Sequence, residues 1–269
     1  MDSGAANKHA GFPSVDPVWN GILKAAQAAV AVEPVLAGTL HSTILSQPSF
    51  ESALSYNLAR LVGTTEVPAA LLRQVFDKAL GAEPTIGRAA RADIMAVTDR
   101  DPACPSFLHP LLWYKGYHAL QTYRIAHWFW EQKRRTLAHF LQSRVSSLFA
   151  VDIHPGAVIG KSVFIDHGTG VVIGETAVVE DGVSMLHGVT LGGTGKERGD
   201  RHPKVRRGVL LCAGAKVLGN IEIGACAKIA AGGVLLDPVP PGRTVAGVPA
   251  RIVGRVDVAE SALSMDQRI

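Results

Sequence analysis

The sequence predicts a helical N-terminal domain followed by a parallel β-helix. Two observations lead to this fold class. From Ile153 to Val239 an aliphatic residue recurs every six positions, with two interruptions, and a fixed hexapeptide period is the sequence mark of a parallel β-helix. From Tyr117 to Phe149 large apolar residues lie at helical spacing instead. The period changes at Val151, where we expect the two domains to meet.

Composition is typical of a folded protein without a membrane or nucleic-acid partner. The 269 residues are 47% hydrophobic and 19% charged, which suits a packed core and argues against disorder. The net charge of +4 fits an anionic small ligand or an ordinary solvated surface, and no basic block carries interleaved aromatic residues. The three cysteines form no C-x-x-C pair, which disfavours structural zinc. No apolar run is long enough to span a bilayer, so we expect a cytoplasmic protein.

The chain divides into four segments. Residues 1–15 are polar and are expected to form a flexible N-terminus. Residues 16–150 are expected to form the helical N-terminal domain, which also serves oligomerisation; Asp16 and the following proline are typical of a helix start. Residues 151–256 should form the β-helix, and residues 257–269 a short C-terminal tail without a period.

The β-helix should be triangular in section. Each hexapeptide supplies one short strand and one turn, and three of them complete a coil that stacks on the next. One end of such a rod needs a cap, for which the helical domain is the candidate. The recurring aliphatic residues are Ile153, Ile159 and Ile165, then Ile173, Val179, Met185 and Leu191, then Val205, Leu211, Val217, Ile223, Ile229 and Leu235.

The first interruption is the run DHGTG from Asp166 to Gly170. His167 is a candidate general base, because neutral imidazole titrates near pH 7. A base needs an orienting group, usually a carboxylate. Asp152 and Asp166 are the two candidates, and we favour Asp152 because neighbours on a strand point to opposite faces. The alternative is that His167 only fills a corner of the coil.

The second interruption runs from Gly192 to Lys204. Its glycines can expose backbone N–H groups to an anion or an oxyanion. The alternative is a solvated loop. A cleft that brings Arg201 and His202 beside His167 would favour a binding site instead. The cations of this segment are Lys196, Arg198, Arg201 and Lys204.

Four histidines of the predicted rod raise the possibility of zinc: His154, His167, His187 and His202. Carbonic anhydrases with a β-helix use three histidines across a subunit seam, with a close second pair that this chain lacks. We therefore expect no metal. Allowing for the two-residue insertion, His187 should stack one coil above His167.

The chain resembles the serine O-acetyltransferases, within the hexapeptide-repeat acyltransferases. The resemblance covers Asp16 to Gly254, and the runs DIHP, DHGTGVVIGETA and TLGGTGK…GDRHP are together highly specific. The matching stretches are DPVWNGI from Asp16, ALSYNLA from Ala53, RDPAC from Arg100, YKGYHALQTYRIAHW from Tyr114, the long run from Val151 to Val205, and VAGVPARIVG from Val245.

The resemblance implies a left-handed parallel β-helix and direct transfer of an acetyl group from acetyl-CoA to L-serine, giving O-acetylserine in cysteine biosynthesis. His167 matches the general base, oriented by Asp152, and His202 matches a second histidine of the site. Asp101 and Asp166 match the carboxylates that hold the substrate ammonium.

The resemblance also implies that Arg201 holds the substrate carboxylate. It implies a homo-oligomer, either a trimer or a dimer of trimers, and inhibition by L-cysteine in the serine pocket. The C-terminal Ile269 matches the residue that inserts into O-acetylserine sulfhydrylase. The alternatives left open are another hexapeptide acyltransferase and a regulatory scaffold for the sulfhydrylase. The positions that match the acetyl-CoA groove are Gly193, Ala213, Ala231 and Gly232.

Overall fold

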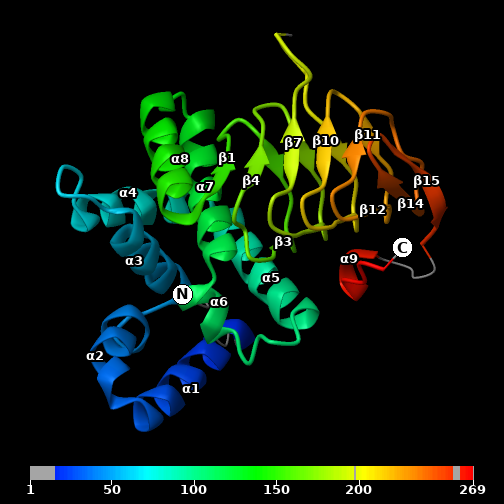
Figure 1. The fold of residues 1–269 in the computed structure, drawn as a ribbon. Helices are drawn as coiled ribbons and strands as arrows, with labels where there is room; N and C mark the ends of the chain where they lie inside the picture. The colour runs from blue at the N-terminus through cyan, green and yellow to red at the C-terminus, as the bar shows by residue number, and fades with distance from the viewer. Residues whose placement is uncertain (1–15, 197, 257–260, 269) are drawn as a thin grey trace, which may run out of the picture.

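The computed structural model describes residues 16–196, 198–256 and 261–268. A cluster of helices forms one end of the molecule and a rod of short strands forms the other (Figure 1). The predicted fold class, a helical domain followed by a parallel β-solenoid, is confirmed. The proposed flexible segment 1–15 and Ile269 lie outside the described residues. In the part of the chain that the structure describes, no helix combines the length and apolarity needed to cross a membrane.

The first described helix, α1, starts at Pro17. The Asp16 carboxylate caps the first helix by accepting from the backbone N–H of Trp19 at 3.0 Å. The helical stretch that ends at Phe149 is two helices, because Lys133 between them has a positive φ of 62°. The elements are α1 (Pro17–Val32), η1 (Pro34–Leu36), α2 (Ala37–Leu40), the π-helical turn η2 (His41–Leu45), α3 (Phe50–Val62), α4 (Ala69–Ala82), α5 (Pro84–Arg100), α6 (Leu108–Trp113), α7 (Lys115–Glu131) and α8 (Arg135–Phe149).

The strands of the rod form three sheets in the described residues, one for each side of the triangle, and all their pairings are parallel except that of β14 with β15. Sheet A contains β1 (Val151–Ile153), β4 (Val171–Ile173), β7 (Thr190–Gly192), β10 (Lys216–Leu218) and β13 (Val234–Leu235). Sheet B contains β2 (Val158–Ile159), β5 (Val178–Val179), β8 (Lys204–Val205) and β11 (Glu222–Ile223). Sheet C contains β3 (Phe164–Ile165), β6 (Ser184–Met185), β9 (Leu210–Leu211), β12 (Lys228–Ile229), β14 (Arg243–Gly247) and β15 (Ala250–Arg255).

The six-residue period sets the register of these sheets. In sheet C, for example, Ile165 pairs with Met185, Met185 with Leu211, and Leu211 with Ile229. These side chains fill the inside of the rod and are almost completely buried. Burying each one contributes about 1.5–3 kcal/mol, so repetition alone builds the core. The antiparallel pairing of β15 with β14 ends the parallel stacking.

The helical domain caps the first coil. Helix α8 packs against β1, and α7 packs against β1 and β3 (Figure 1). Arg124 of α7 fastens the two parts, because it pairs with Asp93 of α5 at 2.7 Å within the helical domain and donates to the carbonyl of Ile159 on the rod at 3.1 Å. Gly116 lets α7 approach the rod, because an added Cβ would overlap the carbonyl of Ile165.

The C-terminal segment returns along sheet C. Its short helix α9 (Ser261–Ser264) lies beside the rod (Figure 1). Ser184 on β6 donates to the carbonyl of Ala262 at 2.9 Å, and Ser261 donates to the carbonyl of Gly208 at 3.1 Å. The tail is therefore anchored by hydrogen bonds in both directions, one donated by the solenoid and one donated by the tail.

Candidate active site

His167 lies in the turn between β3 and β4, at the corner where sheet C meets sheet A. Its φ is +58°, a left-handed conformation that costs a residue other than glycine about 1–2 kcal/mol. Its side chain is 70% exposed. The ring is thus held out of the core by a strained backbone, as functional residues often are.

A pocket of about 580 Å³ opens beside this ring. Asp101 enters it from the C-terminal end of α5, where its carboxylate accepts from the N–H of Ala103 at 2.8 Å. Asp166 enters from the residue before the histidine, and its Oδ2 lies 3.6 Å from Nε2 of His167. Tyr114, at the start of α7, forms part of the wall. The structure therefore brings together three of the predicted site residues.

The pocket is electrostatically prepared for a cation. Burial raises the pKa of Asp166, and the charge of Asp101 raises it further, against a lowering by His167. Burial, together with the neighbouring Cys104 and Asp101, raises the pKa of Tyr114 to about 12. Two carboxylates that share a half-buried pocket repel each other, so a ligand ammonium bound between them would be stabilised.

The corner above His167 carries a column of small residues. The His187 ring lies edge-on to the His167 ring with centroids 5.8 Å apart, as expected from the stacking of coils. Ala213 and Ala231 follow in the next two coils, because Met185, Leu211 and Ile229 pair in register two residues before each position. Beyond His187 the column therefore consists of small side chains.

Asp152 does not lie against His167 of the same chain. It is on the outer face of β1, where its carboxylate accepts from Nε2 of Gln142 at 2.7 Å. The carboxylate nearest to His167 belongs instead to Asp166. The alternation rule is wrong at this position because β3 ends at Ile165 and the next two residues belong to a turn.

Arg201 and His202 occupy a different corner, between sheets A and B. Arg201 forms an ion pair with Glu175 at 2.8 Å. His202 is buried, and its Nδ1 lies 2.9 Å from the hydroxyl of Thr176. Gly193 is nearby, since an added Cβ there would lie 3.7 Å from Nε2 of His202. This corner gathers the cationic and donor groups.

The two corners lie at opposite edges of sheet A and are separate within one chain. A strand such as β4 has three residues, so the edges are about 10 Å apart. The cleft that would unite His167 with Arg201 and His202 is therefore not formed by one chain. The predicted acetyl-CoA positions are divided in the same way, with Gly193 at one corner and Ala213, Ala231 and Gly232 at the other.

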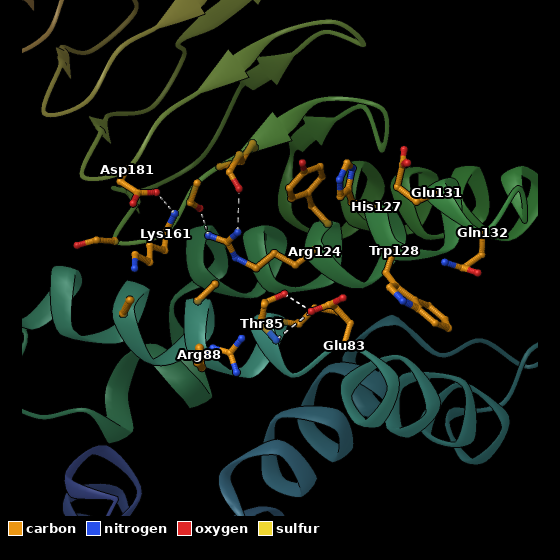
Figure 2. Close-up of a pocket in the computed structure, with 17 residues that line it drawn as sticks. Glu83, Thr85, Arg88, Arg124, His127, Trp128, Glu131, Gln132, Lys161 and Asp181 are labelled. Carbon is orange, nitrogen blue, oxygen red and sulfur yellow. Dashed lines mark hydrogen bonds between the residues drawn. The ribbon is translucent and has the colours of Figure 1, made fainter.

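A cavity of about 830 Å³ lies elsewhere, between α5, α7 and the turn after β2. Figure 2 shows Arg124 reaching from α7 toward the backbone of the first coil, with Trp128 and Arg88 farther out. None of the predicted site residues lines this cavity. It marks the junction between the two domains.

Sequence reasoning missed Tyr114, Glu175 and Thr176, which contact predicted site residues. Glu175 and Thr176 belong to the matched motif GETA, but their roles depend on which corner the second interruption reaches. In the described residues no group of three or more His, Cys, Asp or Glu side chains is arranged to hold a metal ion.

Comparison with known proteins identifies the family. Residues 18–122 match the family model described as serine acetyltransferase, N-terminal. The serine acetyltransferase of Escherichia coli K12 is 54% identical over 250 residues, which cover 93% of this chain and 92% of that protein. A serine acetyltransferase of Brucella abortus, solved in complex with coenzyme A, superimposes with a TM-score of 0.91 at 55% identity, covering 93% of this chain and all of that one.

Two further solved relatives hold small molecules. One is a serine acetyltransferase in complex with cysteine, with a TM-score of 0.92, 51% identity and coverage of 94% of this chain and 98% of that one. The other is the soybean enzyme in complex with serine, with a TM-score of 0.86, 52% identity and coverage of 88% and 97%. The sequence, the fold and these relatives agree, and the chain belongs to the serine acetyltransferase family of enzymes.

Proposed function

We propose that the chain transfers an acetyl group directly from acetyl-CoA to the hydroxyl of L-serine, with His167 as the general base. The exposure of this ring beside a pocket for a small cation carries the proposal. His167 takes the hydroxyl proton while the serine oxygen attacks the thioester carbonyl. The tetrahedral intermediate then expels coenzyme A as a thiolate, which receives the proton back from the imidazolium. An N–H near Gly193 stabilises the oxyanion.

Charge complementarity selects the amino acid. Asp101 and Asp166 bind the ammonium group, whose charge offsets the burial and the repulsion from Asp101 that raise the pKa of Asp166. Arg201 binds the carboxylate with two parallel hydrogen bonds, a geometry that a guanidinium provides and an ammonium does not. The relative bound to serine and the relative bound to cysteine support this pocket, since both ligands have the same charged groups. Cysteine is therefore expected to inhibit by occupying it.

The complete site is proposed to form between two copies of the chain. One copy supplies Asp101, Asp166 and His167, and its neighbour supplies Arg201 and His202. Threefold symmetry allows each copy to use both edges of sheet A in this way. Asp152, on the outer face of sheet A, would then orient His167 of the adjacent copy. A trimer, or a dimer of trimers, satisfies this arrangement.

Acetyl-CoA is proposed to bind along the corner between sheets C and A, with Ala213, Ala231 and Gly232 on one side and Gly193 of the neighbouring copy on the other. The relative solved with coenzyme A supports its use as the acyl donor.

The tail is proposed to end in a ligand for O-acetylserine sulfhydrylase, with Ile269 as the inserted residue, which places the chain in cysteine biosynthesis.

A thiol-release assay tests the proposal. Purified protein is incubated with acetyl-CoA and serine, and threonine, homoserine and a sugar serve as competing acceptors. Serine should be the preferred acceptor, and His167→Ala should lower kcat by at least about 100-fold. His187→Ala is the matched control, because it removes the adjacent ring of the same column. Turnover by His167→Ala at the wild-type rate would refute the assignment of the base.

A further inference from the structure

Thr176 holds the ring of His202 through both its backbone and its side chain. Thr176 lies in the turn after β4. In the same turn Gly174 leaves room for the His202 ring, since a Cβ added to Gly174 would overlap that ring. The backbone N–H of Thr176 donates to Nδ1 of His202 at 3.2 Å, and the hydroxyl oxygen lies 2.9 Å from the same nitrogen.

Counting hydrogen bonds fixes the direction of the contact between the hydroxyl and the ring. A threonine hydroxyl has one proton and two acceptor positions. Both acceptor positions of Thr176 are used, by the backbone N–H of Arg201 at 3.0 Å and by that of His202 at 3.2 Å. Where the hydroxyl contacts the ring, it therefore does so as the donor to Nδ1. With two donors directed at it, Nδ1 carries no proton, and the neutral ring must carry its proton on Nε2.

Asp200 does not change this conclusion. Its pKa is lowered mainly by Lys204, with a smaller contribution from a hydrogen bond to the hydroxyl of Thr176. If that hydroxyl turned toward Asp200, the backbone N–H of Thr176 would still donate to Nδ1 of His202. An amide N–H cannot be redirected without moving the turn.

The other ring nitrogen faces the second loop. Nε2 of His202 lies next to Gly174 and Gly193, and within residues 16–196, 198–256 and 261–268 it has no hydrogen-bond partner. His202 as a whole residue is 7% exposed. An N–H group that has no protein partner and is still reached by solvent is a place where a ligand oxygen can bind.

The surroundings keep this ring neutral. Burial lowers the pKa of His202, Arg201 and Lys204 lower it further, and Glu175 and Asp200 oppose them more weakly. Protonation would also place a proton on Nδ1 against the two donors of Thr176. The ring is therefore unsuited to act as a base, because Nε2 already carries a proton and Nδ1 faces the donors of Thr176.

We propose that Thr176 is a positioning residue that locks His202 in the Nε2–H tautomer, so that His202 donates a hydrogen bond to a substrate oxygen and does not act as a base. The proposal deepens the function proposed above and rests on it. The oxygen belongs either to the carboxylate of the amino acid, beside Arg201, or to the thioester carbonyl, beside Gly193. Loss of the first contact raises KM for serine, and loss of the second lowers kcat.

Two replacements of His202 distinguish a donor from a base. Glutamine can present an N–H near the position of Nε2 but cannot accept a proton, whereas alanine does neither. His202→Ala should lower kcat/KM for serine about 100-fold, and His202→Gln should stay within about 10-fold of the wild type. Equal loss in the two variants, with thermal melting showing both folded, would overturn the donor role.

Two replacements of Thr176 test the positioning role. Thr176→Val keeps the shape and the amide but removes the hydroxyl, and should lower kcat/KM about 10-fold. Thr176→Ser keeps the hydroxyl and should restore activity to near the wild-type value. Wild-type activity in the valine variant would overturn the role of the hydroxyl. If wild-type protein failed to acetylate serine at all, the proposed function would fail instead.

The tautomer can be observed without an activity assay. In wild-type protein labelled with ¹⁵N-histidine, the resonances of His202 are assigned by their loss in His202→Gln. We expect an unprotonated Nδ1 and a protonated Nε2 over the neutral pH range. A protonated Nδ1 in the wild-type protein would overturn the proposal, whatever the variants do.

Discussion

Replacing Arg124 with methionine should destabilise the junction between the helical domain and the solenoid. The guanidinium donates to the fully buried Asp93 at 2.7 Å and 3.0 Å, and to the carbonyls of Ile159 at 3.1 Å and Gly160 at 2.6 Å. Figure 2 shows the two bonds to the rod. The junction matters for function because α5, which carries Asp93, ends at Arg100, directly before Asp101 in the proposed substrate pocket.

The expected loss of stability in Arg124→Met follows from the Asp93 carboxylate that is left without its partner. Removing one member of a buried ion pair costs about 3–5 kcal/mol, because the other charge stays buried without compensation. For a chain of this length that corresponds to a fall in Tm of roughly 10 °C. In the double variant Asp93→Asn/Arg124→Met the stranded charge is absent, while the amide oxygen still accepts from the backbone N–H of Val163. The double variant should therefore recover at least about 1 kcal/mol relative to Arg124→Met.

The pH dependence of Tm provides a second test. Burial already raises the pKa of Asp93 in the folded chain, and Arg124 opposes that rise. Without Arg124 the folded-state pKa of Asp93 lies still higher above its unfolded value. Such a carboxyl stabilises the fold when protonated, and this stability is lost as the pH rises through the folded pKa. The difference in Tm between wild type and Arg124→Met should therefore widen as the pH rises above the unfolded-state pKa of an aspartate, about 4.

The assay is thermal unfolding followed by circular dichroism at one fixed protein concentration, since assembly makes Tm depend on concentration. Arg88→Met is the control, because it removes a cation from the same cavity that is exposed rather than buried. The reasoning would be refuted if the fall in Tm in Arg124→Met were no larger than in Arg88→Met, or if the double variant were less stable than Arg124→Met.

Three further predictions concern ligands and partners. Asp166→Asn should raise KM for serine about 10-fold while leaving KM for acetyl-CoA unchanged, and an unchanged KM for serine would contradict the role of Asp166 in binding. The same variant should have a higher Tm at neutral pH, because the raised pKa of Asp166 means that its charge opposes folding. Arg201→Lys should raise KM for serine more than it lowers kcat, because the lysine loses the bidentate geometry; equal kinetic constants in steady-state assays would count against it. Deleting Ile269 should abolish binding of O-acetylserine sulfhydrylase in a calorimetric titration and leave acetylation intact, and retained binding would exclude the tail as the docking segment.

The fold could be predicted from the sequence because repetition simplifies the problem. Each buried aliphatic residue from Ile153 onward occupies the same place in the coil as the residue one turn away, so the period itself specifies the register. Within that register His187 could be placed above His167 before any coordinates were known. The same counting cannot extend across the segment from Gly192 to Lys204, because a loop of irregular length carries no period. The corner that Arg201 reaches was therefore not predictable.

Local geometry explains the other departures. The alternation of side chains holds only inside a strand, and the turn at His167 removes it, which is why Asp166 and not Asp152 approaches that ring in one chain. Thr176 has no sequence signal of its own, since a small polar residue in a turn is common. Its importance comes from four hydrogen bonds that depend on where His202 folds back.

The central claim, that two copies share each active site, can be tested by mixing two inactive variants. His167→Ala and Arg201→Ala are unfolded together in equal amounts, refolded into mixed oligomers and assayed for thiol release with serine. A site is complete when one copy supplies an intact His167 and its neighbour an intact Arg201, which random assembly around a threefold axis gives in about one quarter of the sites. We predict about 25% of the wild-type activity, well above either variant alone; activity no greater than the mean of the two separate variants would contradict the account.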